Sequence, residues 1–100
     1  MIRTNRLRRS AQDAPHCMCC GKANYDGQQL CLAHSNELRH GRGAYHKSHD
    51  VFGAILCADC HYDVDRNPNL TKEEKREIHR LAHDKTLLWW VRNGYLRVEA

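Results

Sequence analysis

Aromatic residues and long apolar segments are scarce in this 100-residue chain, which has one Phe and two Trp. A chain this short buries a small core and usually needs a disulfide, a metal or a partner for stability. No apolar run approaches the roughly 20 residues that a membrane span requires. Residues 1–6 are polar and basic, unlike the apolar segment of a secretory signal. We therefore expect one soluble, cytoplasmic domain, in which paired cysteines favour a metal over disulfides.

The six cysteines include two pairs with the two-residue gap that lets two thiolates bind one tetrahedral ion. Gly21 follows the first pair and permits the backbone turn that such a metal-binding knuckle needs. This spacing predicts one structural zinc ion per chain, bound by Cys17, Cys20, Cys57 and Cys60.

The two remaining cysteines fall outside these pairs. Using Cys19 in place of either neighbour would break the two-residue gap, so Cys19 is predicted to be spare. Cys31 falls in a predicted strand and is interpreted as a small buried hydrophobe, with a reactive thiol as the alternative.

Hydrophobic alternation predicts two strands between the cysteine pairs, over residues 28–34 and 50–56. Residues 35–43 form a polar segment with two glycines, and a helix is expected from about Cys60 to Asp65. Within that helix His61 and Asp65 are spaced i and i+4, so they share a face and could converge on a second ion or a phosphate. Before the first knuckle, residues 1–14 are expected to form a basic arm or a short helix that ends at Pro15.

A second, longer helix is predicted after a break at residues 67–69. Thr71 and Glu74 form a capping box, and the helix should run to about Arg92. Its last turns are apolar nearly all round, which indicates burial or a partner chain, with a homodimer as one expectation. Residues 95–98 are expected to form a short strand. The face predicted to cover the zinc site consists of Ile78, Leu81, Ala82, Lys85, Leu88 and Trp89.

Two histidines in the long helix, His79 and His83, are also spaced i and i+4 and could bind a metal. No third ligand accompanies them in the sequence. We therefore expect them to be partly exposed helix residues.

The net charge of +4 is modest, but its distribution is uneven. One basic cluster lies in the first nine residues and another lies in the central polar loop. Both suit a polyanion such as DNA, although a solvated surface explains such clusters equally well. Candidate phosphate-binding residues in the loop are Arg39, Arg42, His46 and Lys47.

This ordered set of motifs resembles the HNH, or ββα-metal, endonucleases, and more narrowly the small YbcO-like nuclease family of phages and prophages. The resemblance covers about residues 17–65. It implies a small α+β fold with a basic arm over residues 1–16, a zinc-stapled ββα-metal core over 17–66, and a C-terminal helix and tail over 67–100 packing on the core. The matching residues are Cys17, Cys20, the stretch 33–36, Gly41, Arg42, Gly43, Asp50, the stretch 57–61 and Asp65.

The resemblance also implies catalytic roles. His34 matches the histidine that acts as general base on the attacking water. His61 matches the position that binds the catalytic ion, with Asp65 completing its coordination and Mg²⁺ or Mn²⁺ as the expected ion. Asp50 lies near the middle position of the HNH triad, where Asn is usual, and is expected to orient His34 or its loop. The chain departs from many HNH enzymes in having Ala33 where they place an acidic ligand. Either Asp50 or Asp65 supplies that oxygen, or the ion is held poorly and the nuclease is weak or inactive.

The first hypothesis for function is therefore a metal-dependent DNA endonuclease with low sequence specificity, because no basic recognition helix is apparent. The second is a zinc-stapled nucleic-acid-binding module that does not cleave. A third is a structural zinc protein whose Trp-containing helix docks on another protein. Plasmid nicking and DNA binding at low salt discriminate among the three.

Overall fold

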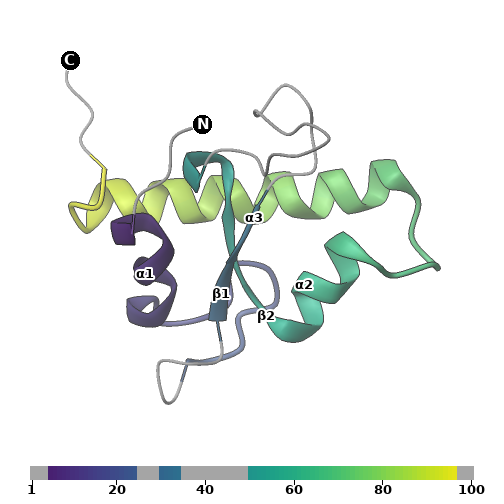
Figure 1. Ribbon diagram of the computed structural model, residues 1–100, viewed down its shortest axis with the longest axis horizontal. Helices are drawn as coiled ribbons and strands as arrows, with labels where there is room; N and C mark the ends of the chain where they lie inside the picture. The colour runs from purple at the N-terminus through teal and green to yellow at the C-terminus, as the bar shows by residue number, and fades with distance from the viewer. Residues whose placement is uncertain (1–4, 25–29, 35–49, 97–100) are drawn as a thin grey trace.

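The fold is a small α+β arrangement of a two-stranded sheet and three α-helices, described from a computed structural model for residues 5–24, 30–34 and 50–96. In chain order the elements are α1 (Asn5–Asp13), β1 (Leu30–Ala33), the short 3-10 helix η2 (Asp50–Phe52), β2 (Ala54–Cys57), α2 (Ala58–Asp65) and α3 (Lys72–Arg92). Figure 1 shows α3 running along the length of the molecule with the two strands crossing it, α1 near its C-terminal end and α2 beside its N-terminal half. None of the helices in the described part combines the length and apolarity needed to cross a bilayer.

The two strands form the centre of the core. They pair antiparallel with Leu30 opposite Cys57 and Ala33 opposite Ala54. All four residues of β2 are buried, and the strand pairs with β1 and contacts α3 and α2. In β1 only Cys31 is exposed. The strand–strand–helix order of β1, β2 and α2 thus follows the order of the predicted elements.

Helix α1 belongs to the folded core. Of the two forms expected for residues 1–14, an arm or a short helix, the structure has the helix, over Asn5–Asp13. Leu7, Ser10, Ala11 and Ala14 are buried because their i, i+3, i+4 and i+7 spacing forms one face. Arg6 donates a hydrogen bond to the carbonyl of Gly94 and lies over the ring of Tyr95, so one cation of this predicted basic cluster joins two elements.

Helix α3 begins and ends as predicted. Glu74 N donates to Thr71 Oγ1 at 3.1 Å, and Thr71 N donates to Glu74 Oε1 at 3.2 Å, which completes the capping box. The helix ends at Arg92, and Gly94 adopts a φ of +77° that few other residues tolerate. Residues 95 and 96 follow as a bend that is no strand, while residues 97 and 98 lie outside the described residues.

The predicted core face of α3 is wrong by about a third of a turn. The buried residues are His79, Ala82, Thr86 and Trp90, with Ile78 and Trp89 packed at the edge. Two residues predicted to cover the zinc site, Leu81 and Leu88, are 56% and 49% exposed. The apolar pattern was misleading because the face of α3 that is buried includes polar side chains, and these side chains form hydrogen bonds with backbone groups of the sheet. The apolar last turns likewise leave Leu87 and Val91 exposed.

The predicted second strand is displaced as well. Residues 50–52 form η2, and the strand covers only Ala54–Cys57. The carbonyl of Gly53, between the two, accepts a hydrogen bond from the His83 side chain in place of a strand partner. The first strand is confirmed over Leu30–Ala33, and residues 28 and 29 of the predicted range lie outside the described residues.

Candidate metal centre and adjacent pocket

Four cysteines converge at the junction of the first knuckle, β2 and α2. The ligand atoms of Cys17, Cys20, Cys57 and Cys60 all lie within 4.8 Å of one another, as the CxxC spacing predicts. Cys20 Sγ and Cys57 Sγ are 3.7 Å apart. Four sulfurs at about 2.3 Å from a tetrahedral zinc would be separated by roughly 3.8 Å, whereas a disulfide requires about 2.05 Å. The four cysteines are free thiols whose spacing fits a metal ion such as zinc.

The knuckle backbone shapes this site. Gly21 has a φ of +81° and donates its N–H to the carbonyl of Cys17 at 3.0 Å, which closes the turn. Met18 N donates to Ile55 O at 3.0 Å and so attaches the knuckle to β2. Because α2 starts directly after Cys57, the metal site and the first turn of this helix are held together.

The thiols ionise with different ease. Burial opposes ionisation of Cys17, but the N–H groups of Cys20, Cys57 and Cys19 outweigh it and lower the pKa of Cys17 to about 7. For Cys60, burial and hydrogen bonds to the neighbouring sulfurs of Cys20 and Cys57 raise the pKa. Four close thiols cannot all ionise by themselves, and a divalent cation removes this conflict. The donor set therefore fits a cation.

Cys57 is the N-cap residue of α2, and its side chain makes no capping hydrogen bond. Ser, Thr, Asp or Asn would be usual at this position. The Cys57 sulfur lies in the four-cysteine cluster instead.

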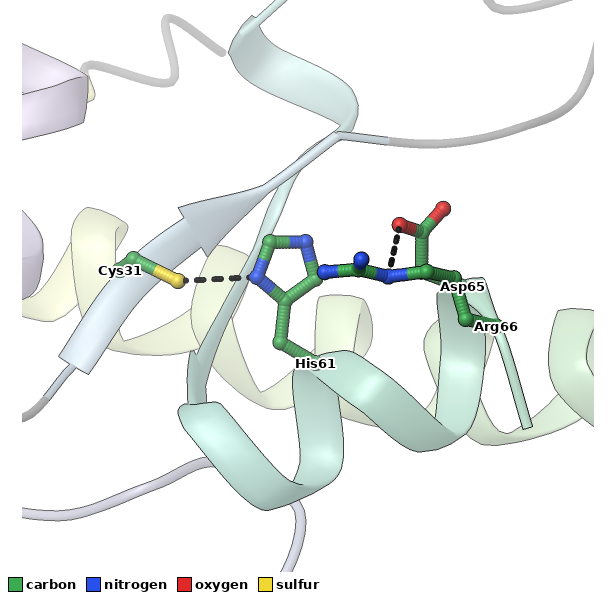
Figure 2. A network of polar contacts seen from close by, with 4 residues as sticks. All are labelled: Cys31, His61, Asp65 and Arg66. Carbon is green, nitrogen blue, oxygen red and sulfur yellow. Dashed lines mark hydrogen bonds and ion pairs between the residues drawn. The ribbon is translucent and has the colours of Figure 1, made fainter.

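A pocket of about 290 Å³ lies between β1 and α2. It is lined by Leu30, Cys31, Ala58, His61, Tyr62, Asp65 and Arg66. Two residues predicted to bind the catalytic ion, His61 and Asp65, therefore border one pocket. In Figure 2 the Asp65 carboxylate lies on the opposite side of the His61 ring from Cys31 and is paired with Arg66, whose Nε is 3.7 Å from Asp65 Oδ2.

Cys31 is not the buried hydrophobe that the sequence predicted. The residue is exposed, and its sulfur lies 3.3 Å from Nδ1 of His61. Although the residue is exposed overall, partial desolvation of its sulfur, with the charge of Cys57 and Cys17, raises the pKa of Cys31 and keeps it a thiol at neutral pH. Strand alternation could have indicated this position, because residue 31 faces away from the buried Leu30 and Leu32.

The structure describes the remaining predicted catalytic residues only in part. His34 is half-buried and directly follows the last residue of β1. Asp50 is the first residue of η2, and its side chain lies outside the described residues. Apart from the four cysteines, no set of three His, Cys, Asp or Glu ligand atoms converges within residues 5–24, 30–34 and 50–96. The candidate phosphate-binding residues Arg39, Arg42, His46 and Lys47 lie outside the described residues.

The prediction that His79 and His83 are partly exposed is wrong for His79 and correct for His83. His79 is 8% exposed, and its Nε2–H donates to Ala33 O at 2.9 Å. His83 is half-buried, and its Nδ1–H donates to Gly53 O at 2.8 Å. In both contacts the ring nitrogen must be the donor, because a carbonyl only accepts. These nitrogens bind the backbone and not a metal.

No family model matches the chain, and no curated protein or solved structure shows significant similarity to it. Functional inference therefore rests on the residues and their geometry.

Proposed function

We propose that this protein is a metal-dependent endonuclease of the HNH type that hydrolyses DNA phosphodiester bonds with low sequence specificity. One observation carries the proposal. The four-cysteine cluster lies where β2 passes into α2, so a bound zinc would hold the helix that carries His61 against the sheet from which His34 extends. A small core held together by zinc in this way would carry the imidazoles of His34 and His61 on two separate segments.

His34 is the proposed general base, because it is a half-buried imidazole that directly follows β1, and an imidazole can take a proton from the attacking water. Asp50 is proposed to orient His34. The loop residues Arg39, Arg42, His46 and Lys47 are proposed to bind phosphates without reading base sequence.

His61 and Asp65 are proposed to hold the second ion, as Mg²⁺ or Mn²⁺, with water completing its coordination. When bound, the ion would stabilise negative charge on the phosphoryl group and on the leaving oxygen. The pair of Arg66 with Asp65 is exposed, with 78% and 46% of the side chains accessible, so breaking it costs little. Arg66 can then turn to a phosphate oxygen while Asp65 binds the ion.

A plasmid-nicking assay with zinc-loaded protein tests the proposal, with Mg²⁺, Mn²⁺ or Ni²⁺ added in turn. The wild type should nick supercoiled DNA. His34→Ala should lose at least about a hundredfold in rate, as expected when a general base is removed, while DNA affinity stays largely unchanged. His16→Ala is the matched control, since His16 is exposed and lies outside the pocket, and it should nick like the wild type.

A wild type that binds DNA in a salt-dependent way but never nicks it would show the non-catalytic binding module instead. A protein without DNA affinity at low salt would exclude both functions.

A further inference from the structure

Cys31 is the one exposed residue of β1, and it faces α2 across the pocket. Figure 2 shows its sulfur directed at the imidazole of His61, on the Nδ1 side of the ring. The pairing of Cys31 with Leu56 in the sheet and the position of His61 in the first half of α2 produce this contact.

A second contact of the same sulfur sets the direction of hydrogen bonding. Cys31 Sγ lies 3.7 Å from the carbonyl oxygen of Leu56, its partner across the sheet. A carbonyl only accepts, so in this contact the thiol is the donor. With its one hydrogen directed at Leu56, the sulfur acts as an acceptor toward His61, and in this arrangement Nδ1 carries the hydrogen of the 3.3 Å contact. The chain of donors thus runs from His61 through Cys31 to the backbone of β2.

We propose that Cys31 is a positioning residue that holds His61 as its Nδ1–H tautomer, which leaves an unprotonated Nε2 free to bind an ion in the pocket. This inference rests on the proposed function in assigning that ion to His61. In the view of Figure 2, Nε2 points to the side of the ring on which the Asp65 carboxylate lies.

The arrangement matches a general requirement of metal-binding histidines. The nitrogen that does not bind the metal usually donates to a fixed acceptor, which sets the orientation of the ring, and losing that acceptor typically weakens metal binding 10- to 100-fold. Here the acceptor is a thiol whose own anchor, Leu56, directly precedes the cluster cysteine Cys57. The structural metal site and the proposed catalytic histidine are therefore connected through two adjacent residues of β2.

The tautomer can be measured directly on zinc-loaded protein from the ¹⁵N shifts and two-bond ¹H–¹⁵N couplings of the His61 ring. The wild type should show the Nδ1–H pattern at a pH where the ring is neutral. Cys31→Ala should shift the ring to the Nε2–H form, while Cys31→Ser, which retains an acceptor and a donor, should keep the wild-type pattern. Cys19→Ala removes the other exposed thiol outside the four-cysteine cluster and should change nothing.

Titration with Mn²⁺ provides the second readout. Cys31→Ala should weaken Mn²⁺ binding about 10- to 100-fold with the zinc content and circular dichroism unchanged, and Cys31→Ser should restore it. An Nε2–H pattern in the wild type would overturn the proposal, as would a Cys31→Ala variant with unchanged ring shifts. Equal loss of Mn²⁺ in Cys31→Ser and Cys31→Ala with the tautomer unchanged would show direct ligation by sulfur and also overturn it.

Failure of the nuclease proposal is distinguishable from these outcomes. A wild type that never nicks DNA, yet shows the Nδ1–H pattern that depends on Cys31, retains the positioning role without the activity.

Discussion

At the scale of single residues, Ser10 shows how one small polar side chain joins two helices. Its hydroxyl donates to Leu7 O at 2.5 Å and accepts from Trp90 Nε1 at 2.6 Å. Both Ser10 and Trp90 are fully buried. Because a buried indole N–H needs an acceptor, α1 and the end of α3 are coupled through this hydroxyl.

Ser10→Ala should therefore lower the free energy of unfolding by about 1–3 kcal/mol, the cost of leaving the Trp90 N–H without an acceptor. Urea unfolding followed by Trp fluorescence measures the change. Gln12→Ala on the exposed face of α1 is the control and should stay within about 0.5 kcal/mol of the wild type. Equal stability of Ser10→Ala and the control would show that water replaces the hydroxyl.

At the scale of elements, α3 holds the sheet through a stripe of polar side chains. His79, His83 and Thr86 are spaced i, i+4 and i+7, and they bind the backbone of Ala33, Gly53 and Ile55. Ala33 directly precedes the proposed base His34, so the helix also fixes the end of β1. A helix that packs this way satisfies backbone groups that the pairing of only two strands leaves without a strand partner.

Thr86→Val removes one hydrogen-bonding group of this stripe and leaves the volume of the side chain nearly unchanged. The Thr86 hydroxyl accepts from Ile55 N at 3.0 Å and donates to Ala82 O at 2.8 Å, and the residue is fully buried. Replacing the hydroxyl with a methyl group leaves the Ile55 N–H without a partner. This change should lower the free energy of unfolding, measured in urea, by about 1–3 kcal/mol. Lys85→Ala on the exposed side of α3 should change stability by less than about 0.5 kcal/mol. A neutral Thr86→Val would remove the argument that α3 fixes β2 by hydrogen bonding.

At the scale of the whole molecule, the four-cysteine cluster joins the knuckle before β1, the end of β2 and the start of α2. Each of these segments is short, and β1 and β2 have four residues each. Two strands of this length are marginal in water without further support. The metal is therefore expected to determine whether the domain folds.

Removal of zinc by a strong chelator should unfold the domain, and Cys57→Ala should have the same effect, because structural zinc can contribute on the order of 10 kcal/mol to a small fold. Zinc content by mass spectrometry, expected at one ion per chain, and far-UV circular dichroism measure this. Cys19→Ala should keep both the ion and the fold. Native circular dichroism after complete loss of zinc would show that the apolar core is sufficient.

Local patterns in the sequence determined much of this structure. The two CxxC gaps and Gly21 predicted the four-cysteine cluster, and the Thr71–Glu74 capping box predicted the start of α3. The meeting of the two knuckles follows from the metal-ligand chemistry of their cysteines. Each knuckle and the start of α3 depend on residues close together in the chain, where backbone geometry limits the outcome. The strand–strand–helix order was predictable for the same reason.

Only the tertiary structure decided which face of α3 is buried, and that Cys31 meets His61. Both depend on hydrogen bonds between segments far apart in sequence, from His79, Thr86 and Cys31 to backbone groups of the sheet. An apolar pattern in the sequence indicates which residues avoid water, but it does not indicate which polar residues find a buried hydrogen-bond partner.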